Sequence, residues 1–361
     1  KNYGIKNGEK MNNIIKSRIE YFNKNIILQT NDRTMYCNLI NEYSEYLKFN
    51  EQYCISEELI KFKVVKDTSL YKKYLEKLIN HPRPKFKNIY IRVRRENVII
   101  IDKEKKEVTM IYDTYTDEKL QHIEEIILGI LGKLIENDKY FFIHAACVSK
   151  NGKGIVLVGD KNIGKTSLML EFIQNSFDLV NNSQLGIKGN QGVSIPARIG
   201  IRFESLYNGV IKEKYIDQTK KTSDYSYIIG RNNKLDPKQK FNLTVKEIRE
   251  IFKIKTISET EIKAIIEPHY LPGQEKIKIQ EMSREELINK LIENKRSGIY
   301  NSVNYMENLF DNNGNLKLLG LIQKTNIKGY KIFQNQSNEK ELMEYIQEIL
   351  NDEQMIKNRR I

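Results

Sequence analysis

The pattern of hydrophobic and polar positions differs between two parts of the chain, and the first part covers residues 1–115. Here helical spacing over residues 38–47 and 70–79 is mixed with alternating, strand-like runs. The runs lie at residues 89–93, 97–102 and 108–112. Together these patterns predict a small N-terminal α+β domain over residues 1–115, and their order indicates no function.

From residue 140 the pattern changes to strand, turn, strand, loop and helix. These elements are expected at residues 140–149, 154–158 and 165–174, with an Asn151-Gly152 turn between the two strands. A further strand at residues 177–181 completes a strand–helix–strand unit, the building block of a parallel sheet. We therefore predict an α/β core domain over residues 116–335, introduced by one amphipathic helix at residues 117–135.

Beyond residue 200 the pattern is mixed. Strands are expected at residues 225–229 and 263–266, and helices at residues 244–252, 283–295 and 338–350. Thr244 and Ser283 begin two of these helices and are followed by Glu in the first turn, which is typical of helix capping. The last helix falls within residues 336–361, which we assign to a third segment.

Composition limits the classes of function. The chain has 361 residues and 40% hydrophobic content, enough for two domains. Its apolar stretches are far shorter than the roughly 20 residues that cross a bilayer, and the first residues contain no signal-like apolar core. Three scattered cysteines argue against a disulfide framework. We therefore expect a cytoplasmic protein without membrane insertion.

The net charge of +13 suggests nucleic acid as one class of partner. However, lysines are spread along the whole chain among many glutamates, and they form no concentrated basic stripe. We therefore expect no nucleic-acid partner, whereas an acidic peptide would suit the excess of positive charge.

One segment carries recognisable chemistry, because it fits G-x-x-x-x-G-K-[ST] at every fixed position. Its residues are Gly159, Asp160, Lys161, Asn162, Ile163, Gly164, Lys165 and Thr166, with Ser167 following them. In this P-loop pattern, two glycines let successive N–H groups curl around a phosphate chain, and the helix N-terminus adds partial positive charge. The lysine reaches the β- and γ-phosphates, and the Thr166 hydroxyl is the expected Mg²⁺ ligand. The sequence therefore predicts binding of ATP or GTP with Mg²⁺.

A P-loop identifies a ligand and not a reaction. An energy-using NTPase normally also has an apolar strand that ends in Asp or Glu, which holds Mg²⁺ and orients water. Here the apolar run at residues 177–180 leads into Asn181, Asn182 and Ser183, so no carboxylate stands at its end.

The stretch from His144 to Phe172, followed by residues 177–183, resembles the HPr serine kinase superfamily, including the kinases of peptide natural-product clusters. That family places a His-containing strand and a short hairpin directly before its P-loop. The similarity covers roughly residues 120–350 in layout, with residues 328–333 and the last helix as a closing segment, but only residues 140–185 match its motifs. It implies an α/β fold: a P-loop core with a mixed or parallel sheet resembling the HPr kinase C-terminal domain, beside the smaller N-terminal α+β domain.

The resemblance also implies site residues. His144 matches the family's pre-loop histidine, either as a functional group near the phosphates or as an ordinary strand residue. Asn182 and Ser183 stand where the family has Asp, and neither takes a proton at neutral pH. The chain is therefore a weakened relative, a variant inactivated by substitution, or an enzyme in which another carboxylate has taken over. Glu204 is the first candidate for that carboxylate, with Asp178 and Glu267 behind it.

Two further groups have an ordinary structural interpretation beside a functional one. Arg198 and Arg202 alternate with isoleucines on a predicted strand, so they point the same way and either clamp phosphates or face solvent. His269 lies between Pro268 and Pro272, and we expect a rigid structural loop there.

Two functions from different classes remain. The first is ATP-dependent phosphoryl transfer to a Ser or Thr hydroxyl of a peptide or small protein, with Lys165, His144, Glu204, Asn182 and Ser183 as the candidate catalytic residues. A small-molecule hydroxyl is the other class of acceptor. The second function is that of a nucleotide-dependent binding or regulatory protein that has lost its catalytic base. The sequence leaves the oligomeric state open, with a homo-oligomer as one option.

Overall fold

The computed structural model describes residues 14–52, 59–80, 85–86, 88–231, 236–271, 276–299, 301–310, 327–335 and 338–351. The chain divides into two compact units, and the division falls within helix α3 (Asp117–Glu136). Unit 1 comprises Lys1–Leu131 and Ile299–Asn313, and unit 2 comprises Gly132–Gly298 and Gly314–Ile361. The domain boundaries inferred from the sequence stay predictions.

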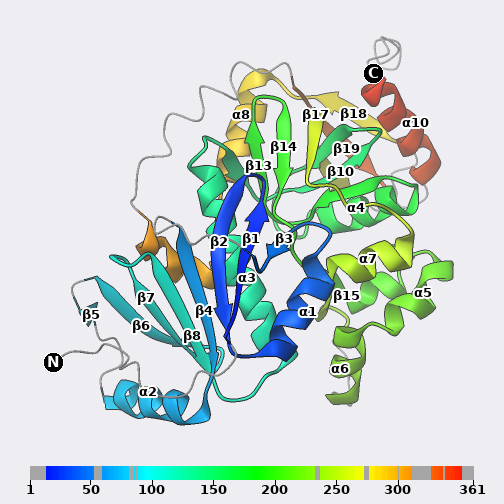
Figure 1. Ribbon diagram of the computed structural model, residues 1–361. Helices are drawn as coiled ribbons and strands as arrows, with labels where there is room; N and C mark the ends of the chain where they lie inside the picture. Colours follow the sequence, from blue (N-terminus) through cyan, green and yellow to red (C-terminus); the bar gives the residue numbers. More distant parts are fainter. Residues whose placement is uncertain are drawn as a thin grey trace. The chain divides into compact units, whose positions relative to one another are not determined.

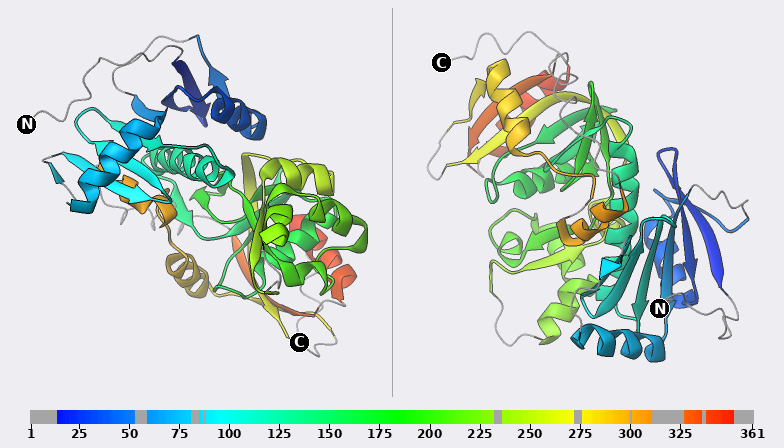
Figure 2. Two further views of the ribbon diagram at one scale, coloured as in Figure 1. Left: turned by 90° about the horizontal axis from the view of Figure 1, so that it is seen from below. Right: turned by 90° about the vertical axis from the view of Figure 1, so that its left-hand side faces the viewer.

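Unit 1 is built on a mixed sheet, which in the described part of the chain has eight strands in the order β3-β1-β2-β4-β8-β7-β6-β5 (Figure 1). Their bounds are β1 (Ile15–Tyr21), β2 (Lys24–Thr30), β3 (Lys48–Asn50), β4 (Ile60–Lys66), β5 (Lys85–Phe86), β6 (Ile89–Arg94), β7 (Asn97–Asp102) and β8 (Glu107–Tyr112). Helix α1 (Arg33–Tyr43) precedes β3, and helix α2 (Thr68–Asn80) packs on β7 and β8 (Figure 2). The three predicted strands of this unit are therefore confirmed as β6, β7 and β8.

Unit 2 contains a second mixed sheet, in which nine strands are described. Seven follow the order β12-β10-β11-β17-β14-β13-β9, and β19 pairs with both β17 and β18. Their bounds are β9 (Phe141–Ile143), β10 (Ala146–Lys150), β11 (Lys153–Leu157), β12 (Asp178–Asn181), β13 (Leu185–Lys188), β14 (Gln191–Ser194), β17 (Glu259–Tyr270), β18 (Lys278–Glu281) and β19 (Lys328–Gln334). A separate pair, β15 (Ile199–Arg202) and β16 (Lys240–Leu243), forms a two-stranded sheet.

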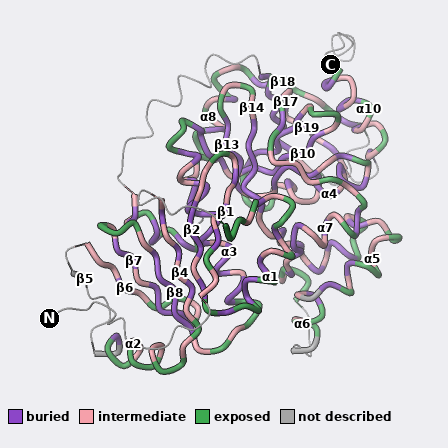
Figure 3. Tube along the Cα trace, viewed as in Figure 1, coloured by how far each residue is buried: buried purple, intermediate pink, exposed green. Residues whose placement is uncertain are grey.

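Helices cover both faces of the unit 2 sheet. Helices α4 (Lys165–Gln174) and α10 (Glu339–Leu350) share one hydrophobic core with Ile155, Leu157 and Ile266. Helix α8 (Arg284–Glu293) contributes to the core on the other face, together with β9 and β13. The central strands are buried on both faces, as the tube in Figure 3 shows. This double burial explains why β11 reads as a continuous apolar run in the sequence.

The predicted strand–helix–strand unit is present, but its two strands are not neighbours. Strand β10 lies between β11 and β12 and is antiparallel to both. The parallel neighbour of β11 is instead β17, with Leu157 opposite Ile266. Local patterning identifies strands, whereas which strands pair depends on long-range contacts, so the sequence contained no sign that β17 is the parallel neighbour of β11.

Three other expectations need correction. Residues 225–229, expected as a strand, belong to helix α6 (Ser223–Arg231), because Tyr225 and Ile228 contact the core at helical spacing. The strand expected at residues 140–149 is broken between β9 and β10, at His144. The first helix begins five residues earlier than predicted, since Asp32 caps it through the N–H of Met35.

The remaining described helices are α5 (Glu213–Lys220), α7 (Val245–Phe252) and two 3₁₀ helices, η1 (Phe203–Leu206) and η2 (Asn301–Leu309). The predicted capping of α7 and α8 is confirmed, since Thr244 and Ser283 each form a full capping box. Among the described residues, no helix is long and apolar enough to cross a membrane.

Candidate functional site

The P-loop joins β11 to α4 at the carboxyl end of the strand. Three of its residues have positive φ angles: Gly159 at 128°, Asn162 at 74° and Gly164 at 108°. At Gly164 a Cβ would lie 2.5 Å from the ring of Tyr270, so this position needs glycine for space as well as for conformation. The loop thus curls back on itself, as a backbone cradle for phosphates requires.

Lys165 is the first residue of α4, and its side chain returns into the loop. Its Nζ donates hydrogen bonds to the carbonyl oxygens of Gly159 (2.7 Å) and Asp160 (2.9 Å). Burial lowers the pKa of Lys165, and the Asp160 carboxylate opposes this effect. The ammonium therefore lies inside the curl of the loop, where a phosphate chain would run.

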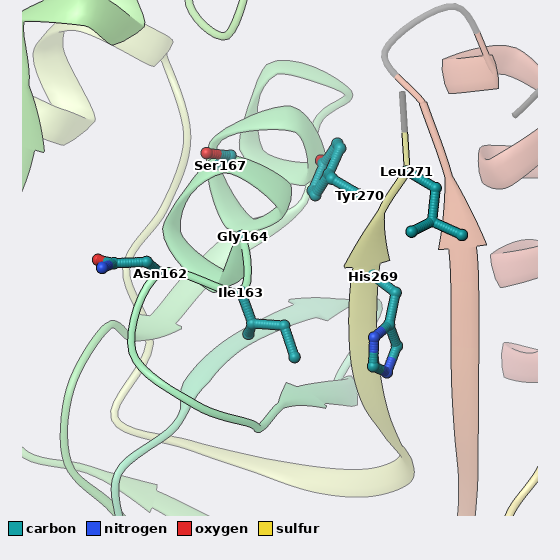
Figure 4. A pocket seen from close by; sticks show the side chains of 7 residues that line it. All are labelled: Asn162, Ile163, Gly164, Ser167, His269, Tyr270 and Leu271. Atoms are coloured by element: carbon teal, nitrogen blue, oxygen red, sulfur yellow. The ribbon is translucent and has the colours of Figure 1, made fainter. Parts of the chain in front are cut away.

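A cavity of about 370 Å³ lies beside the loop. Figure 4 shows loop residues on one side of it and the end of β17 on the other. The lining residues are Asn162, Ile163, Gly164, Ser167, His269, Tyr270 and Leu271. The ring of Tyr270 is held by a hydrogen bond of 3.2 Å from its hydroxyl to Glu171, whose pKa burial raises to about 7.

His144 lies at the break between β9 and β10. Its Nδ1 is 2.9 Å from the carbonyl oxygen of Ser183. Because a carbonyl only accepts, Nδ1 carries the proton in this contact, which leaves the lone pair of a neutral ring on Nε2. Burial, with the positive charge of Lys165, lowers the pKa of His144, so the ring is neutral at pH 7.

Asn182 and Ser183, which stand where the resemblance implies aspartates, follow the end of β12 and lie near His144. Asn181 donates to the carbonyl oxygen of Gln184, whereas the side-chain oxygen of Asn182 is buried and has no hydrogen-bond partner among the described residues. The structure therefore places Ser183 beside His144 and leaves a neutral, unpartnered oxygen at Asn182.

Glu204 is linked to the loop through an arginine. It accepts a hydrogen bond of 2.9 Å from Nη1 of Arg202, and Nη2 of the same guanidinium donates to the side-chain oxygen of Asn162. Asp178, by contrast, lies opposite Ser149, near the Asn151-Gly152 turn and at the other end of the strands from the P-loop. Asp178 therefore does not belong to this site.

Glu267 was a lower-ranked candidate than Glu204 for the missing carboxylate, and in the structure it lies next to the P-loop. Its Cγ is 3.4 Å from where a Cβ on Gly159 would lie, and Glu267 is buried in an ion pair of 3.0 Å with Lys290. In the sequence, the signal for this acid was the apolar run of β17 that ends directly before Glu267.

His269 corrects an expectation, since it lies within β17 and not in a loop. Its ring stacks on that of Phe333, with 4.8 Å between the ring centroids.

A comparison with protein families gives one match to this region. The model of the Ras family matches residues 154–195. No curated protein matches the chain. The match covers β11, the P-loop, α4 and the strands that follow, so the chain carries a P-loop NTPase-like element in a mixed α/β unit. The likeness to HPr kinases remains a resemblance.

The residues present fit a nucleoside triphosphate with Mg²⁺. Gly159 and Gly164 keep the cradle clear of side chains, and Lys165 lies within it. Thr166 and Ser167 occupy the first turn of α4, where N–H groups and hydroxyls are available to phosphate and metal. Within the described part of the chain, no cluster of three His, Cys, Asp or Glu side chains could hold a metal alone. Thr166, in this first turn, is the residue that would hold Mg²⁺ together with nucleotide phosphates.

Proposed function

We propose that the chain is an Mg²⁺-dependent phosphotransferase, which moves the terminal phosphoryl group of ATP or GTP to a Ser or Thr hydroxyl of a peptide or small protein. The observation that supports transfer, in preference to binding alone, is the state of His144. It is neutral, its tautomer is set by Ser183, and it lies close enough to Lys165 for the lysine charge to lower its pKa. In this proposal His144, at the break between β9 and β10, supplies the base that Asn182 and Ser183 do not.

In this proposal each residue has one task. The loop amides and Lys165 bind the phosphates and neutralise the charge that develops in transfer. When bound, Mg²⁺ would be held through Thr166 and would supply further positive charge at the phosphate oxygens. His144 Nε2 takes the proton of the acceptor hydroxyl as its oxygen bonds to phosphorus. The bond between phosphorus and the leaving oxygen breaks, and the nucleoside diphosphate departs.

The test follows phosphate transfer from ATP and from GTP to a set of Ser- and Thr-containing peptides by mass spectrometry, where each transfer adds about 80 Da. A His144→Gln variant should lose roughly 10²- to 10⁴-fold in kcat while nucleotide affinity changes little, because a general base acts only in the chemical step. A Lys165→Ala variant should lose activity because it no longer binds the nucleotide phosphates or neutralises their charge.

The pH profile separates a base from a structural residue. Since the pKa of His144 is lowered, the wild type should keep its activity down to pH values below 6.5 and lose it only as Nε2 is protonated. The residual activity of His144→Gln should lack this acid limb. An unchanged limb in the variant would remove His144 from the mechanism.

The second candidate function is nucleotide-dependent binding without transfer. It is favoured by Asn182 and Ser183, which stand where the resemblance implies aspartates. Tight binding of ATP by the wild type without turnover, together with turnover by an Asn182→Asp variant, would establish this reading in place of the first.

A further inference from the structure

The antiparallel pair of β15 and β16 brings two cations together beside the P-loop. Arg202 and Lys240 are directly opposite each other in this pair. Like charges in this arrangement repel, and the neighbouring charges that act on Lys240, those of Arg202 and Lys161, are both positive. Neither cation belongs to the buried face of this strand pair, whose buried residues are Ile199, Ile201, Phe241 and Leu243.

Arg202 is oriented from two sides. Glu204 holds Nη1 at 2.9 Å, and Asn162 of the P-loop accepts from Nη2. A guanidinium has five N–H donors, so this arrangement uses part of its capacity and aims the group at the loop. Glu204 is accordingly a positioning residue for Arg202, and Asn162 is held in the left-handed conformation that the loop requires.

Lys240 reaches the same space. Its side chain passes over Gly200, where Cδ would be 3.3 Å from a Cβ on that glycine. Its charge acts on both Lys165 and His144, which lie at the phosphate end of the site. Lys161 and Lys165 of the loop and the Arg202–Lys240 pair therefore lie near one another.

We propose that Arg202 and Lys240 form a clamp for the terminal phosphate of the bound nucleoside triphosphate. The clamp supplies from the same chain the positive charge that stabilises the transferring group, and the repulsion between its two members is relieved when the phosphate oxygens lie between them. This inference rests on the proposed function. We assign the terminal phosphate to the clamp for two reasons. Arg202 is hydrogen-bonded to Asn162 of the P-loop, and Lys165 marks where the phosphate chain would run.

The test compares affinities for ATP and ADP, each with Mg²⁺, by calorimetry at low ionic strength. Lys240→Met and Arg202→Met should each weaken ATP binding on the order of tenfold while ADP affinity is retained, because only ATP reaches the clamp. Lys238→Met is the matched control: Lys238 is an exposed lysine two residues before Lys240, and it should leave both affinities unchanged.

A second variant of Arg202 separates the effect of its charge from that of its hydrogen bonds. Arg202→Lys retains the charge but loses the bond to Asn162, and it should fall between wild type and Arg202→Met. Equal losses for ATP and ADP would mean that the β15–β16 pair only supports the loop, and unchanged ATP affinity would mean that the pair binds no phosphate. Either result overturns the clamp and leaves the proposed function standing. Failure of the wild type to bind ATP and ADP would overturn both.

Discussion

Single residues of the P-loop carry most of the site, and their roles differ in how visible they are in sequence. Lys165 and both glycines are recognisable from spacing alone, because phosphate binding needs those residue types in that order. Asn162 is a variable position of the motif, and its contact with Arg202 is visible only in the structure. Spacing therefore identifies the atoms that meet the nucleotide, and tertiary contacts identify those that hold them.

Gly164 should be among the least replaceable residues of the chain. Gly164→Ala requires a Cβ at a φ of 108°, 2.5 Å from the Tyr270 ring, so we expect loss of nucleotide binding and a destabilisation of about 1–3 kcal/mol. Gly189→Ala is the matched control, since Gly189 also has positive φ (63°) but nothing within 4 Å of its Cβ position. Urea unfolding and nucleotide titration of both variants measure the effect, and equal losses would deny the clash with Tyr270.

At the scale of elements, the buried side chain of His122 links α3 to η2 within unit 1, although these helices are far apart in the sequence. His122 Nε2 donates to the Tyr305 hydroxyl (2.7 Å), and Nδ1 accepts from the Asn97 amide (3.1 Å). Burial, with the nearby charges of Arg95 and Arg94, lowers the pKa of His122 to about 4. Both ring nitrogens are satisfied only while the ring is neutral.

This contact makes stability depend on pH in a stated direction. The folded-state pKa is lower than the unfolded value of 6.5, so the unfolded chain takes the proton first and stability falls as pH decreases from 6.5 towards about 4. The loss should approach about 3 kcal/mol at the lower end. Urea unfolding at pH 7, 6 and 5 measures it, and a His122→Gln variant should show a shallower dependence. Parallel curves for the two proteins would contradict the assignment.

At the scale of the whole molecule, the P-loop, strand β17 and the antiparallel pair of β15 and β16 all belong to unit 2. Nucleotide binding should therefore stabilise unit 2 by mass action, by about 2.7 kcal/mol at a ligand concentration one hundred times Kd. Amide hydrogen exchange with and without MgATP measures this, with slower exchange expected in β11, α4 and β17. The strands of unit 1 are the internal reference, and equal slowing there would argue against a site confined to unit 2.

The P-loop, α4 and most helices can be predicted from the sequence, because these depend on short-range spacing, capping and the chemistry of phosphate binding. The sequence also indicates the missing acid at Asn182 and Ser183. Three features become visible only in the folded chain: β17 is the parallel neighbour of β11, residues 225–229 are helical, and His144 contacts Ser183. Strand pairing and side-chain contacts between distant segments depend on how whole faces are buried together, and no local pattern encodes that choice.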